Sequence, residues 1–284
     1  MKCMLIILTA TAISFATGKG EVLGKNETFA SHICSKFFYR QNEPMGLSQQ
    51  NSARICQMYD YNGVISPYFA SLYDRDRRMP LYSAYVFKTV GKGKRPKKWM
   101  IEPQLAFANL TKCMAGEGVV PDRKQLITSQ AVNDDYKKLD PRYNRGHLNP
   151  RGHQNTTESR RATFTLTNIV PQTVISNGKW ALYESSIVNI SKYYQCSEIF
   201  LVTGVIPTKI NPNERVNIPS HMWSAYCCVD QNGMPIRNGA ALISNTVTPI
   251  LQNLSLQDLE SMLHKVPFFA NYIQIFYNRC KKLI

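Results

Sequence analysis

Residues 163–184 read TFTLTNIVPQTVISNGKWALYE, and this stretch divides into two halves with different patterns. In the first half, threonines are interleaved with apolar residues, which is typical of a β-strand. In the second half, apolar residues recur at helical spacing from Trp180 onward, and residues 179–194 contain no Gly or Pro. Asn177 stands where a helix N-cap is expected. We therefore predict a strand over residues 164–169, followed by a helix that starts at Asn177.

Four polar residues in and before this stretch have the chemistry that cleavage of a phosphate ester needs. His147 supplies a base that is neutral near physiological pH, Asn177 an amide oxygen for a hard metal ion, and Glu184 a carboxylate. Arg145 supplies a cation for the phosphate. If the helix starts at Asn177, Glu184 lies about two turns later on the same face. A strand with His147, a second strand and this helix would form a ββα unit around one ion.

These motifs resemble those of the DNA/RNA non-specific endonucleases, the ββα-metal nuclease family, and most closely the secreted endonuclease domain-containing 1-like proteins. The family signature is Asp-Arg-Gly-His, then Thr-Asn-Ile-x-Pro-Gln, then an Asn, and then Trp-x-x-x-Glu. The resemblance extends to residues 82–85, 202–204 and 223–228. It implies an α+β fold with a central, mostly antiparallel sheet flanked by helices. The chain matches the signature at Arg145, Gly146, His147, Asn168, Pro171, Gln172, Asn177, Trp180 and Glu184.

Two positions depart from the family signature. Asn144 stands where the signature has Asp, which removes a carboxylate beside the expected base. One residue is also missing between Asn177 and Trp180 relative to the commoner pattern. The first departure could lower turnover or change the metal preference, and the second could turn the start of the helix slightly. Neither removes the base or the metal ligand.

The resemblance and the residue chemistry together imply a role for each candidate. His147 would act as the general base. Asn177 would bind Mg²⁺, with Mn²⁺ as an alternative, through its amide oxygen, since Mg²⁺ often keeps several waters beside few protein ligands. Glu184 would hydrogen-bond the waters of the metal and hold Asn177 in place. Arg145 would contact the substrate phosphate and assist catalysis.

Further candidates lie on both sides of these residues. A second catalytic cation is expected from the basic segment 94–99, where Arg95 is favoured. Lys97 is the alternative cation and a candidate for substrate binding. Asn168 would either contact the substrate or satisfy backbone groups beside the site.

His153 matches no motif, and we expect it at the surface. The pair His147 and His153 could suggest zinc, but no nearby cysteine pair completes a finger-like spacing, so a zinc site is not favoured. Trp180 and Tyr183 are expected in the core of the helix rather than as platforms for bases.

Composition and motifs narrow the function further. The chain has 34 Lys and Arg against 19 Asp and Glu, a net charge of +15, and such a field attracts polyanions. The expected partners are DNA and RNA, bound through the phosphate backbone, although charge alone would equally suit anionic glycans or membrane surfaces. Gly-x-Ser-x-Gly and His-Glu-x-x-His motifs are absent from the sequence. We therefore predict an Mg²⁺-dependent endonuclease with little sequence preference. The alternative is a catalytically silent binder of nucleic acid or anionic glycan with the same fold.

The N-terminal residues and the cysteines predict export. Lys2 precedes an apolar run over residues 4–16, so residues 1–18 are expected to be a signal peptide and the mature protein to be extracellular and free of the membrane. Seven of the eight cysteines then remain, and most should pair. Cys34–Cys56 is the expected local bridge and Cys113 the expected odd thiol. Five sequons are candidate glycosylation sites: Asn26, Asn109, Asn155, Asn189 and Asn253.

Residues 19–284 are expected to form one domain, because no linker, repeat or low-complexity segment interrupts them. Strands and helices are interspersed without a regular βαβ alternation, which favours the α+β class. The sequence does not indicate an oligomeric state. Besides the strand over 164–169, strands are predicted over 81–87, 99–101, 199–205 and 222–229, and helices over 47–58, 180–194 and 256–265.

Overall fold

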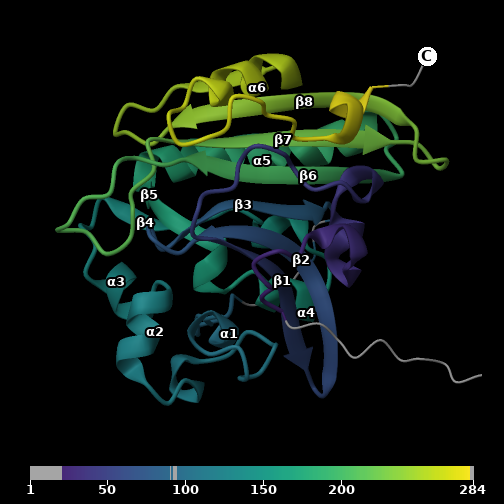
Figure 1. The fold of residues 1–284 in the computed structure, drawn as a ribbon. Coiled ribbons are helices and arrows are strands. Elements are labelled where there is room, and N and C mark those ends of the chain that lie inside the picture. Colours follow the sequence, from purple (N-terminus) through teal and green to yellow (C-terminus); the bar gives the residue numbers. More distant parts are fainter. Residues whose placement is uncertain (1–20, 90, 92–94, 282–284) are drawn as a thin grey trace, which may run out of the picture.

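The structure is a computed structural model, and it describes residues 21–89, 91 and 95–281. The expected signal peptide over residues 1–18 lies outside the described residues. The described chain forms one large sheet, one small sheet, and helices on both faces of the large sheet (Figure 1). The predicted α+β class with a central antiparallel sheet is confirmed.

The large sheet has seven strands in the order β1-β2-β3-β6-β7-β8-β9. Each strand is antiparallel to its neighbours. The step from β3 to β6 joins strands that are distant in sequence, and the chain between them builds the small sheet and its helices. The strands are β1 (Ser52–Tyr61), β2 (Val64–Asp74), β3 (Met79–Val86), β6 (Glu198–Ile206), β7 (His221–Val229), β8 (Pro235–Ser244) and β9 (Leu251–Leu254), with β4 (Tyr143–His147) and β5 (Ile169–Thr173) in the small sheet.

Both faces of the large sheet are covered, so its central strands are buried almost throughout. β7, for example, is buried at every residue after the first. Successive side chains of a strand point to opposite faces. Met222 and Cys228 therefore join the core on one face of the sheet, and Trp223 and Cys227 join the core on the other.

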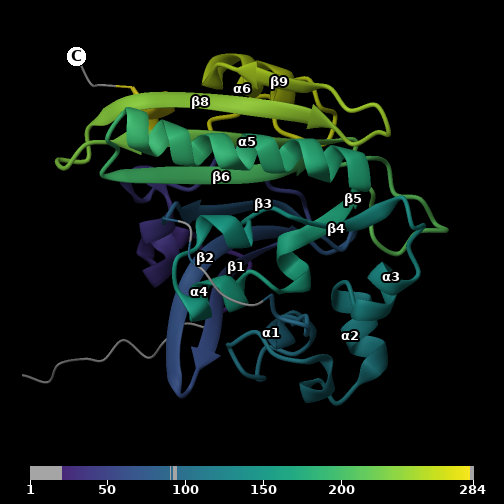
Figure 2. The same cartoon turned by 180° about the vertical axis from the view of Figure 1, so that it is seen from behind.

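The longest helix, α5 (Val174–Tyr193), runs along one face of the sheet in front of β6, β7 and β8 (Figure 2). Trp180, Tyr183 and Ile187 attach it to the sheet, and all three are buried. The opposite face is covered by α6 (Leu256–His264) together with N-terminal and C-terminal segments. The remaining helices are α1 (Pro103–Ala106), α2 (Arg123–Ser129), α3 (Asn133–Lys137) and α4 (Thr157–Ala162), with 3₁₀ helices η1 (Phe29–Ser31), η2 (Ile33–Phe37), η3 (Tyr39–Gln41), η4 (Glu117–Val119), η5 (Arg151–His153), η6 (Leu166–Asn168) and η7 (Tyr277–Cys280).

Three disulfides staple the described chain. The predicted Cys34–Cys56 bridge is confirmed, and Cys113 is the free thiol, as predicted. The side chain of Cys113 is buried. The other two bridges are Cys196–Cys228 and Cys227–Cys280. Because Cys227 and Cys228 are adjacent in β7, they point to opposite faces, and each holds a different layer against the same strand.

Three of the predicted elements are wrong. Residues 47–58 were expected to be helical, but they lead into β1, which is buried on both faces over residues 55–58 and therefore lacks a period of two. Residues 99–101 form isolated bridges rather than a strand.

The strand predicted over residues 164–169 is the third wrong element, because residues 166–168 form the 3₁₀ helix η6 and β5 begins only at Ile169. The threonines of this stretch bind a buried carboxyl group. Thr165 and Thr167 both donate to Glu102 Oε1, at 2.9 and 3.0 Å. The helix starts one turn before Asn177, because Thr173 is the N-cap, with its Oγ1 accepting from the backbone N–H of Ser176 at 3.1 Å.

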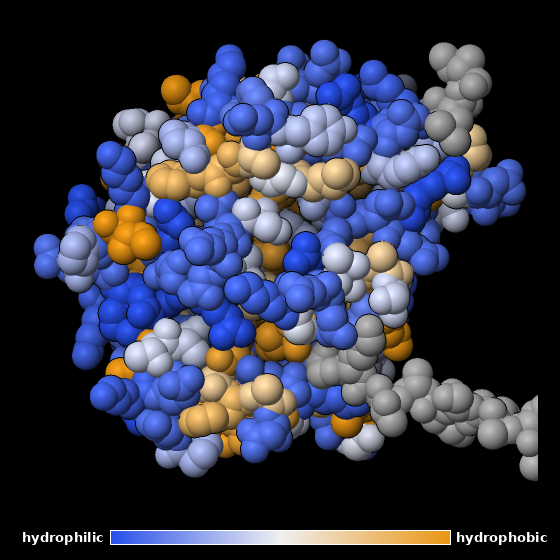
Figure 3. All heavy atoms as spheres, viewed as in Figure 1, coloured by the Kyte–Doolittle hydropathy of each residue, from blue (hydrophilic) through white to orange (hydrophobic). Residues whose placement is uncertain are grey.

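The face shown in Figure 3 is mainly hydrophilic, and its apolar side chains form small separate patches. Among the described residues, no helix combines the length and the apolar character needed to cross a membrane.

Candidate active site

The small sheet carries the first half of the site. β4 pairs antiparallel with β5, and Arg145 and His147 of β4 are two residues apart, so their side chains leave the strand on the same side. Gly146 is required between them, because a Cβ at this position would collide with the side chain of Gln172 in β5. The close pairing of the two strands therefore fixes the direction of Arg145 and His147.

The helix α5 carries the second half. Asn177 lies in its first turn, and Glu184 follows seven residues later, about two turns along the helix. Both side chains are partly exposed, whereas Trp180 and Tyr183 are buried in the core, as the sequence indicated. The earlier start of the helix leaves the shared face of Asn177 and Glu184 unchanged.

The two halves meet at a pocket of about 240 Å³. The pocket brings together five of the seven predicted site residues and adds Arg151, which the sequence reasoning did not single out. Arg151 lies four residues after His147, and nothing in the spacing of the motif marks it. The lining consists of Arg95, Arg145, His147, Pro150, Arg151, Gly152, Phe164, Asn177 and Glu184.

His147 is held between aromatic rings at the pocket. Its ring centroid lies 5.3 Å from that of Trp99 and 5.1 Å from that of Phe164. Burial, with a further contribution from the charges of Arg95 and Arg151, lowers the pKa of His147 to about 3. The imidazole is therefore neutral at physiological pH. Its Nε2 is shielded from solvent and has no hydrogen-bond partner among the described residues.

Asn177 is oriented by the residue that departs from the family signature. The Nδ2 of Asn177 donates to Oδ1 of Asn144 at 2.7 Å. This contact leaves the amide oxygen of Asn177 as the group it can offer to a cation. An amide oxygen beside a carboxylate is a set of hard donors, which suits Mg²⁺ or Mn²⁺ better than a soft metal.

Glu184 lies where a carboxyl group is costly to ionise. Burial raises the pKa of Glu184 to about 8. The backbone at this position is also fixed, because His153 Nε2 donates to the carbonyl oxygen of Glu184 at 2.9 Å. The other ring nitrogen of His153 contacts the hydroxyl of Tyr85 at 3.0 Å.

His153 is therefore not at the surface, and that prediction is wrong. Its exposed fraction is 3%, and its ring packs on Tyr85 and Phe87. Both nitrogens of His153 are engaged with protein groups. In the described part of the chain, the one group of three possible metal ligands is His32, Cys34 and Cys56, whose two sulfurs are joined in a disulfide.

Arginines dominate the charge of the pocket. The guanidinium of Arg145 lies 4.9 Å from the ring centroid of Trp99, and its Nη1 donates to Asn133 Oδ1 at 3.4 Å. The guanidinium of Arg95 lies 5.5 Å from the ring centroid of Phe164. Together with Arg151, these side chains give the pocket three positive groups against the single acidic side chain of Glu184.

The two remaining candidates lie outside the pocket. Asn168 is fully buried beneath it, where its Oδ1 accepts from Ser83 and from the backbone N–H of Asn149, both at 2.9 Å. It satisfies the chain beside the site instead of facing the substrate, which was the alternative reading of this residue. Lys97 is exposed and lines a neighbouring, larger hollow.

The sequence is similar to one protein family and to several curated proteins. The sequence profile of the family described as DNA/RNA non-specific endonuclease matches residues 56–275. The chain is 29% identical over 270 residues to the Homo sapiens Endonuclease domain-containing 1 protein, covering 92% of this chain and 50% of that protein. It is 28% identical over 257 residues to the Mus musculus protein of the same name, covering 88% and 48%.

Two more distant similarities were found, one to a curated protein and one to a solved structure. The chain is 27% identical over 195 residues to the Xenopus laevis protein Nuclease EXOG, mitochondrial, covering 60% of this chain and 52% of that protein. The chain thus spans about half the length of the curated relatives it matches. A solved structure titled "Crystal structure of the EndoG/EndoGI complex: Mechanism of EndoG inhibition" matches with a TM-score of 0.48 and 16% identity, over 75% of this chain and 84% of that chain.

Proposed function

Because the chain belongs to the DNA/RNA non-specific endonuclease family, we propose that it is a metal-dependent endonuclease that hydrolyses DNA and RNA with little sequence preference. The observation that carries the proposal is the convergence of a neutral histidine, an oriented asparagine, a glutamate and three arginines on one small pocket. Three arginines can hold the substrate by its phosphates, which are the same in every sequence.

His147 acts as the general base. A neutral imidazole whose Nε2 is not engaged by the protein can accept a proton from an attacking water molecule once a small shift of the ring exposes that nitrogen. The aromatic rings of Trp99 and Phe164 pack against the imidazole of His147 and hold it in one orientation. Little reorganisation is therefore needed when the proton moves. The negative charge of a bound phosphate would stabilise the imidazolium that forms.

Asn177 and Glu184 would hold Mg²⁺ or Mn²⁺, Asn177 through its amide oxygen and Glu184 through waters of the ion. A divalent ion at this place supplies charge stabilisation for the phosphate and for the leaving oxygen. Asn144 keeps the amide of Asn177 turned toward the pocket through the 2.7 Å hydrogen bond. His153 keeps the backbone of Glu184 in place.

The arginines bind the substrate. The guanidinium of Arg145 lies over the ring of Trp99 and that of Arg95 over the ring of Phe164, so cation–π contacts help to hold both groups at the pocket. A planar guanidinium can bind a phosphate through two hydrogen bonds. The net charge of +15 would bring nucleic acid to the surface without regard to sequence.

We also propose that the protein works outside the cell. Three disulfides suit an oxidising compartment. The asparagines of all five sequons are exposed, so each is accessible to glycosylation: Asn26, Asn109, Asn155, Asn189 and Asn253.

The rival function is a silent binder of nucleic acid or anionic glycan, and Asn144 is the residue that favours it. The signature carboxylate would add a negative charge near the metal, and Asn144 lacks that charge. However, its amide oxygen still accepts the hydrogen bond from Asn177. The orientation of the metal ligand therefore survives the replacement.

Digestion of supercoiled plasmid and of RNA by the purified protein, with Mg²⁺ and with EDTA, tests the proposal. We expect nicking and linearisation with Mg²⁺ and none with EDTA. His147→Ala should cost at least about 100-fold in rate, the lower range for a positioned base, while binding of DNA persists. Lys265→Gln, an exposed change beside α6 on the opposite face of the sheet, is the control for loss of one charge. An inert wild type that still binds DNA would establish the silent binder instead.

A further inference from the structure

A second and larger hollow lies beside the active-site pocket. Its volume is about 760 Å³, a size typical of sites for small organic ligands. Segments far apart in the sequence meet here: β1, the chain before Met100, η4, α3 and the end of α4. The lining consists of Tyr59, Pro96, Lys97, Lys98, Trp99, Met100, Gly116, Glu117, Asn133, Asp134, Lys137 and Arg161.

Two residues connect the hollow to the active-site pocket. Trp99 lines the hollow, and its ring packs on His147 and beneath the guanidinium of Arg145. Asn133 also lines the hollow, and its Oδ1 accepts from Arg145 Nη1 at 3.4 Å. A molecule in the hollow would therefore lie one side chain away from the groups proposed to act on the phosphate.

The hollow combines aromatic rings with an excess of positive charge. Tyr59 and Trp99 are both partly exposed at its wall. Tyr59 belongs to a small group of tyrosines, with its ring centroid 6.4 Å from that of Tyr61, which in turn lies under the guanidinium of Arg161 at 5.3 Å. Four of the lining side chains are basic and two are acidic, a balance of +2. Aromatic rings in a basic groove are the chemistry with which proteins bind unpaired bases.

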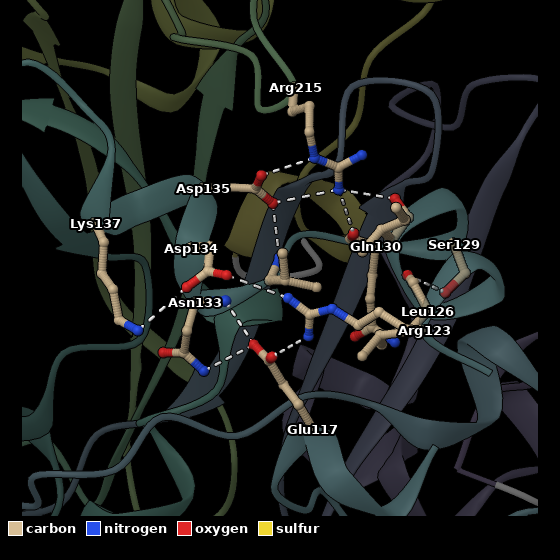
Figure 4. A network of polar contacts seen from close by, with 12 residues as sticks. Glu117, Arg123, Leu126, Ser129, Gln130, Asn133, Asp134, Asp135, Lys137 and Arg215 are labelled. Atoms are coloured by element: carbon tan, nitrogen blue, oxygen red, sulfur yellow. Dashed lines mark hydrogen bonds and ion pairs between the residues drawn. The ribbon is translucent and has the colours of Figure 1, made fainter. Parts of the chain in front are cut away.

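On the acidic side of the hollow, the side chains are held in place by hydrogen bonds and ion pairs, as Figure 4 shows. Asn133 Nδ2 donates to Glu117 Oε1 at 2.9 Å, and Lys137 and Arg123 both pair with Asp134, at 3.1 and 3.3 Å. Because these acidic groups are paired, the wall presents fixed amide and carboxylate groups without a strong negative field. Such groups can hydrogen-bond the amino and imino groups on the edge of a base.

We propose that this hollow binds an unpaired base of single-stranded DNA or RNA, next to the phosphate held in the active-site pocket. The inference rests on the proposed function, and it names the substrate form that this site accepts best. A base enters the hollow only if it is free of its partner strand, because a paired base is stacked in the duplex and its edge is occupied. Stacking on Trp99 and Tyr59 is tolerant of sequence, since every base has an aromatic face.

Tryptophan fluorescence gives a direct readout of this contact. The chain has three tryptophans, and Trp180 and Trp223 are buried to 1% and 0% exposure, so a ligand in the hollow acts on Trp99. In EDTA, which prevents metal-dependent cleavage, a ten-residue oligothymidylate should quench the fluorescence of the protein. An abasic oligonucleotide of the same length and charge, and a blunt duplex of ten base pairs, should bind without this quenching.

A matched set of variants separates stacking from charge. Tyr59→Leu removes the ring but keeps an apolar side chain, and it should weaken oligothymidylate binding about fivefold or more, as expected for loss of one stacking contact. Its affinity for the abasic oligonucleotide should change less than about twofold. Arg161→Gln, at the exposed rim, should weaken both ligands, and Lys265→Gln neither. Circular dichroism of each variant checks the fold, and the quenching in the wild-type protein tests the proposal even if Tyr59→Leu fails to fold.

The outcomes are distinguishable from failure of the proposed function. Equal quenching by the abasic and the base-containing oligonucleotide, or no quenching by either, overturns the base-binding assignment. Stronger quenching by a heparin oligosaccharide assigns the hollow to anionic glycans instead. If the wild type cleaves plasmid but shows no base-dependent quenching, the proposed nuclease function is supported and the base-binding site is rejected. A wild type that shows the quenching but cleaves nothing keeps the base site and removes the nuclease.

Discussion

Asn144 is the residue at which the chain departs most clearly from the family signature. Its hydrogen bond to Asn177 shows which property of the signature Asp is kept and which is lost. The neutral amide keeps the acceptor that orients Asn177 and gives up the charge that would attract a cation. The orientation and the charge can therefore be separated by substitution.

Asn144→Asp should restore the charge while keeping the acceptor. We expect the half-saturating Mg²⁺ concentration for cleavage to fall by roughly fivefold, the scale of about 1 kcal/mol for a close, solvated charge pair. Asn144→Ala removes the acceptor, and we expect cleavage to fall about 10- to 100-fold, as for other groups that orient a metal ligand. Asn232→Asp adds the same charge in the exposed turn between β7 and β8 and should change neither quantity. If Asn144→Ala cleaves as fast as wild type, the hydrogen bond to Asn177 has no part in the reaction.

The raised pKa of Glu184 predicts a pH-dependent need for metal. With a pKa of about 8, the carboxyl group of the metal-free protein is mostly protonated at neutral pH, so a proton competes with the cation. The half-saturating Mg²⁺ concentration should therefore fall as the pH rises from about 6 to 8, by up to about tenfold per unit, and level off above 8. Cleavage rates across a grid of pH and Mg²⁺ measure it, and Glu184→Gln should remove the slope. The same slope in Glu184→Gln would assign the titration to another group.

Among single residues, the sequence predicted those whose place at the pocket follows from side-chain chemistry and from regular spacing along a strand or helix. Asn177 and Glu184 share a face because seven residues make about two turns of helix, wherever that helix begins. Arg151 could not be predicted in the same way, since it reaches the pocket from the 3₁₀ helix η5 and follows no period. The motif left two roles open for Asn168, substrate contact or satisfaction of the chain beside the site, and the hydrogen bonds of its amide oxygen show the second.

Among the elements, α5 depends on a cap that also joins it to the sheet. Thr173 Oγ1 accepts from the N–H of Ser176 at 3.1 Å and donates to the carbonyl of Thr246 at 2.9 Å. The cap stands one turn before Asn177, so fraying of this end would loosen the proposed metal ligand.

We expect Thr173→Ala to lower the free energy of unfolding by about 1 kcal/mol, the usual effect of losing an N-cap hydroxyl, and to raise the half-saturating Mg²⁺ concentration. Thr173→Ser keeps the hydroxyl and should stay close to wild type in both respects. Urea unfolding and Mg²⁺-dependent cleavage measure the two effects. If Thr173→Ala loses stability but keeps its metal requirement, the first turn of α5 does not position Asn177.

The strands that were predicted correctly are rich in β-branched and aromatic residues, although β3 and β7 are buried almost throughout. β3, β6, β7, α5 and α6 each match a predicted element to within a few residues. The threonine-rich stretch was misread because its side chains meet a buried carboxyl group, Glu102, whose position the local pattern does not contain. β1 was misread because residues 52–58 contain one β-branched residue, Ile55, and no aromatic residue, so the composition of this buried run does not indicate a strand.

Over the whole molecule, buried histidines link stability to pH. Burial lowers the pKa of His147 to about 3 and of His153 to about 4, below the ordinary value near 6.5. Between these values the unfolded chain binds protons that the folded chain does not, so stability is present above about pH 6.5 and is lost as the pH falls toward 4.

His153→Gln should reduce this loss, because an amide does not titrate and can still bond the carbonyl of Glu184. We expect the fall in unfolding free energy between pH 6.5 and 4 to be smaller than in wild type by on the order of 2 kcal/mol. Denaturant titrations at a series of pH values measure it, and His264→Gln, exposed at the end of α6, is the control. An unchanged pH profile in His153→Gln would mean that other groups cause the acid sensitivity.

The cysteines show which long-range contacts can be predicted from the sequence and which cannot. Cys34–Cys56 was predictable as a local bridge, and Cys113 as the thiol left over. The partners of Cys227 and Cys228 were not, because adjacent cysteines point to opposite faces only once they are known to lie in a buried strand. Pairing then follows from which layer covers each face.

The adjacent cysteines of β7 have a consequence for a chain exposed to proteases. The Cys196–Cys228 bridge closes one covalent ring and the Cys227–Cys280 bridge closes a second, and the two rings join at neighbouring residues inside the buried strand. Every loop between residues 197 and 226 or between 229 and 279 therefore belongs to a ring. A single cut in any of these loops opens the ring but leaves both new ends attached to the body of the protein. Fragments would separate only after reduction, so a nicked molecule would keep the sheet behind the candidate site intact.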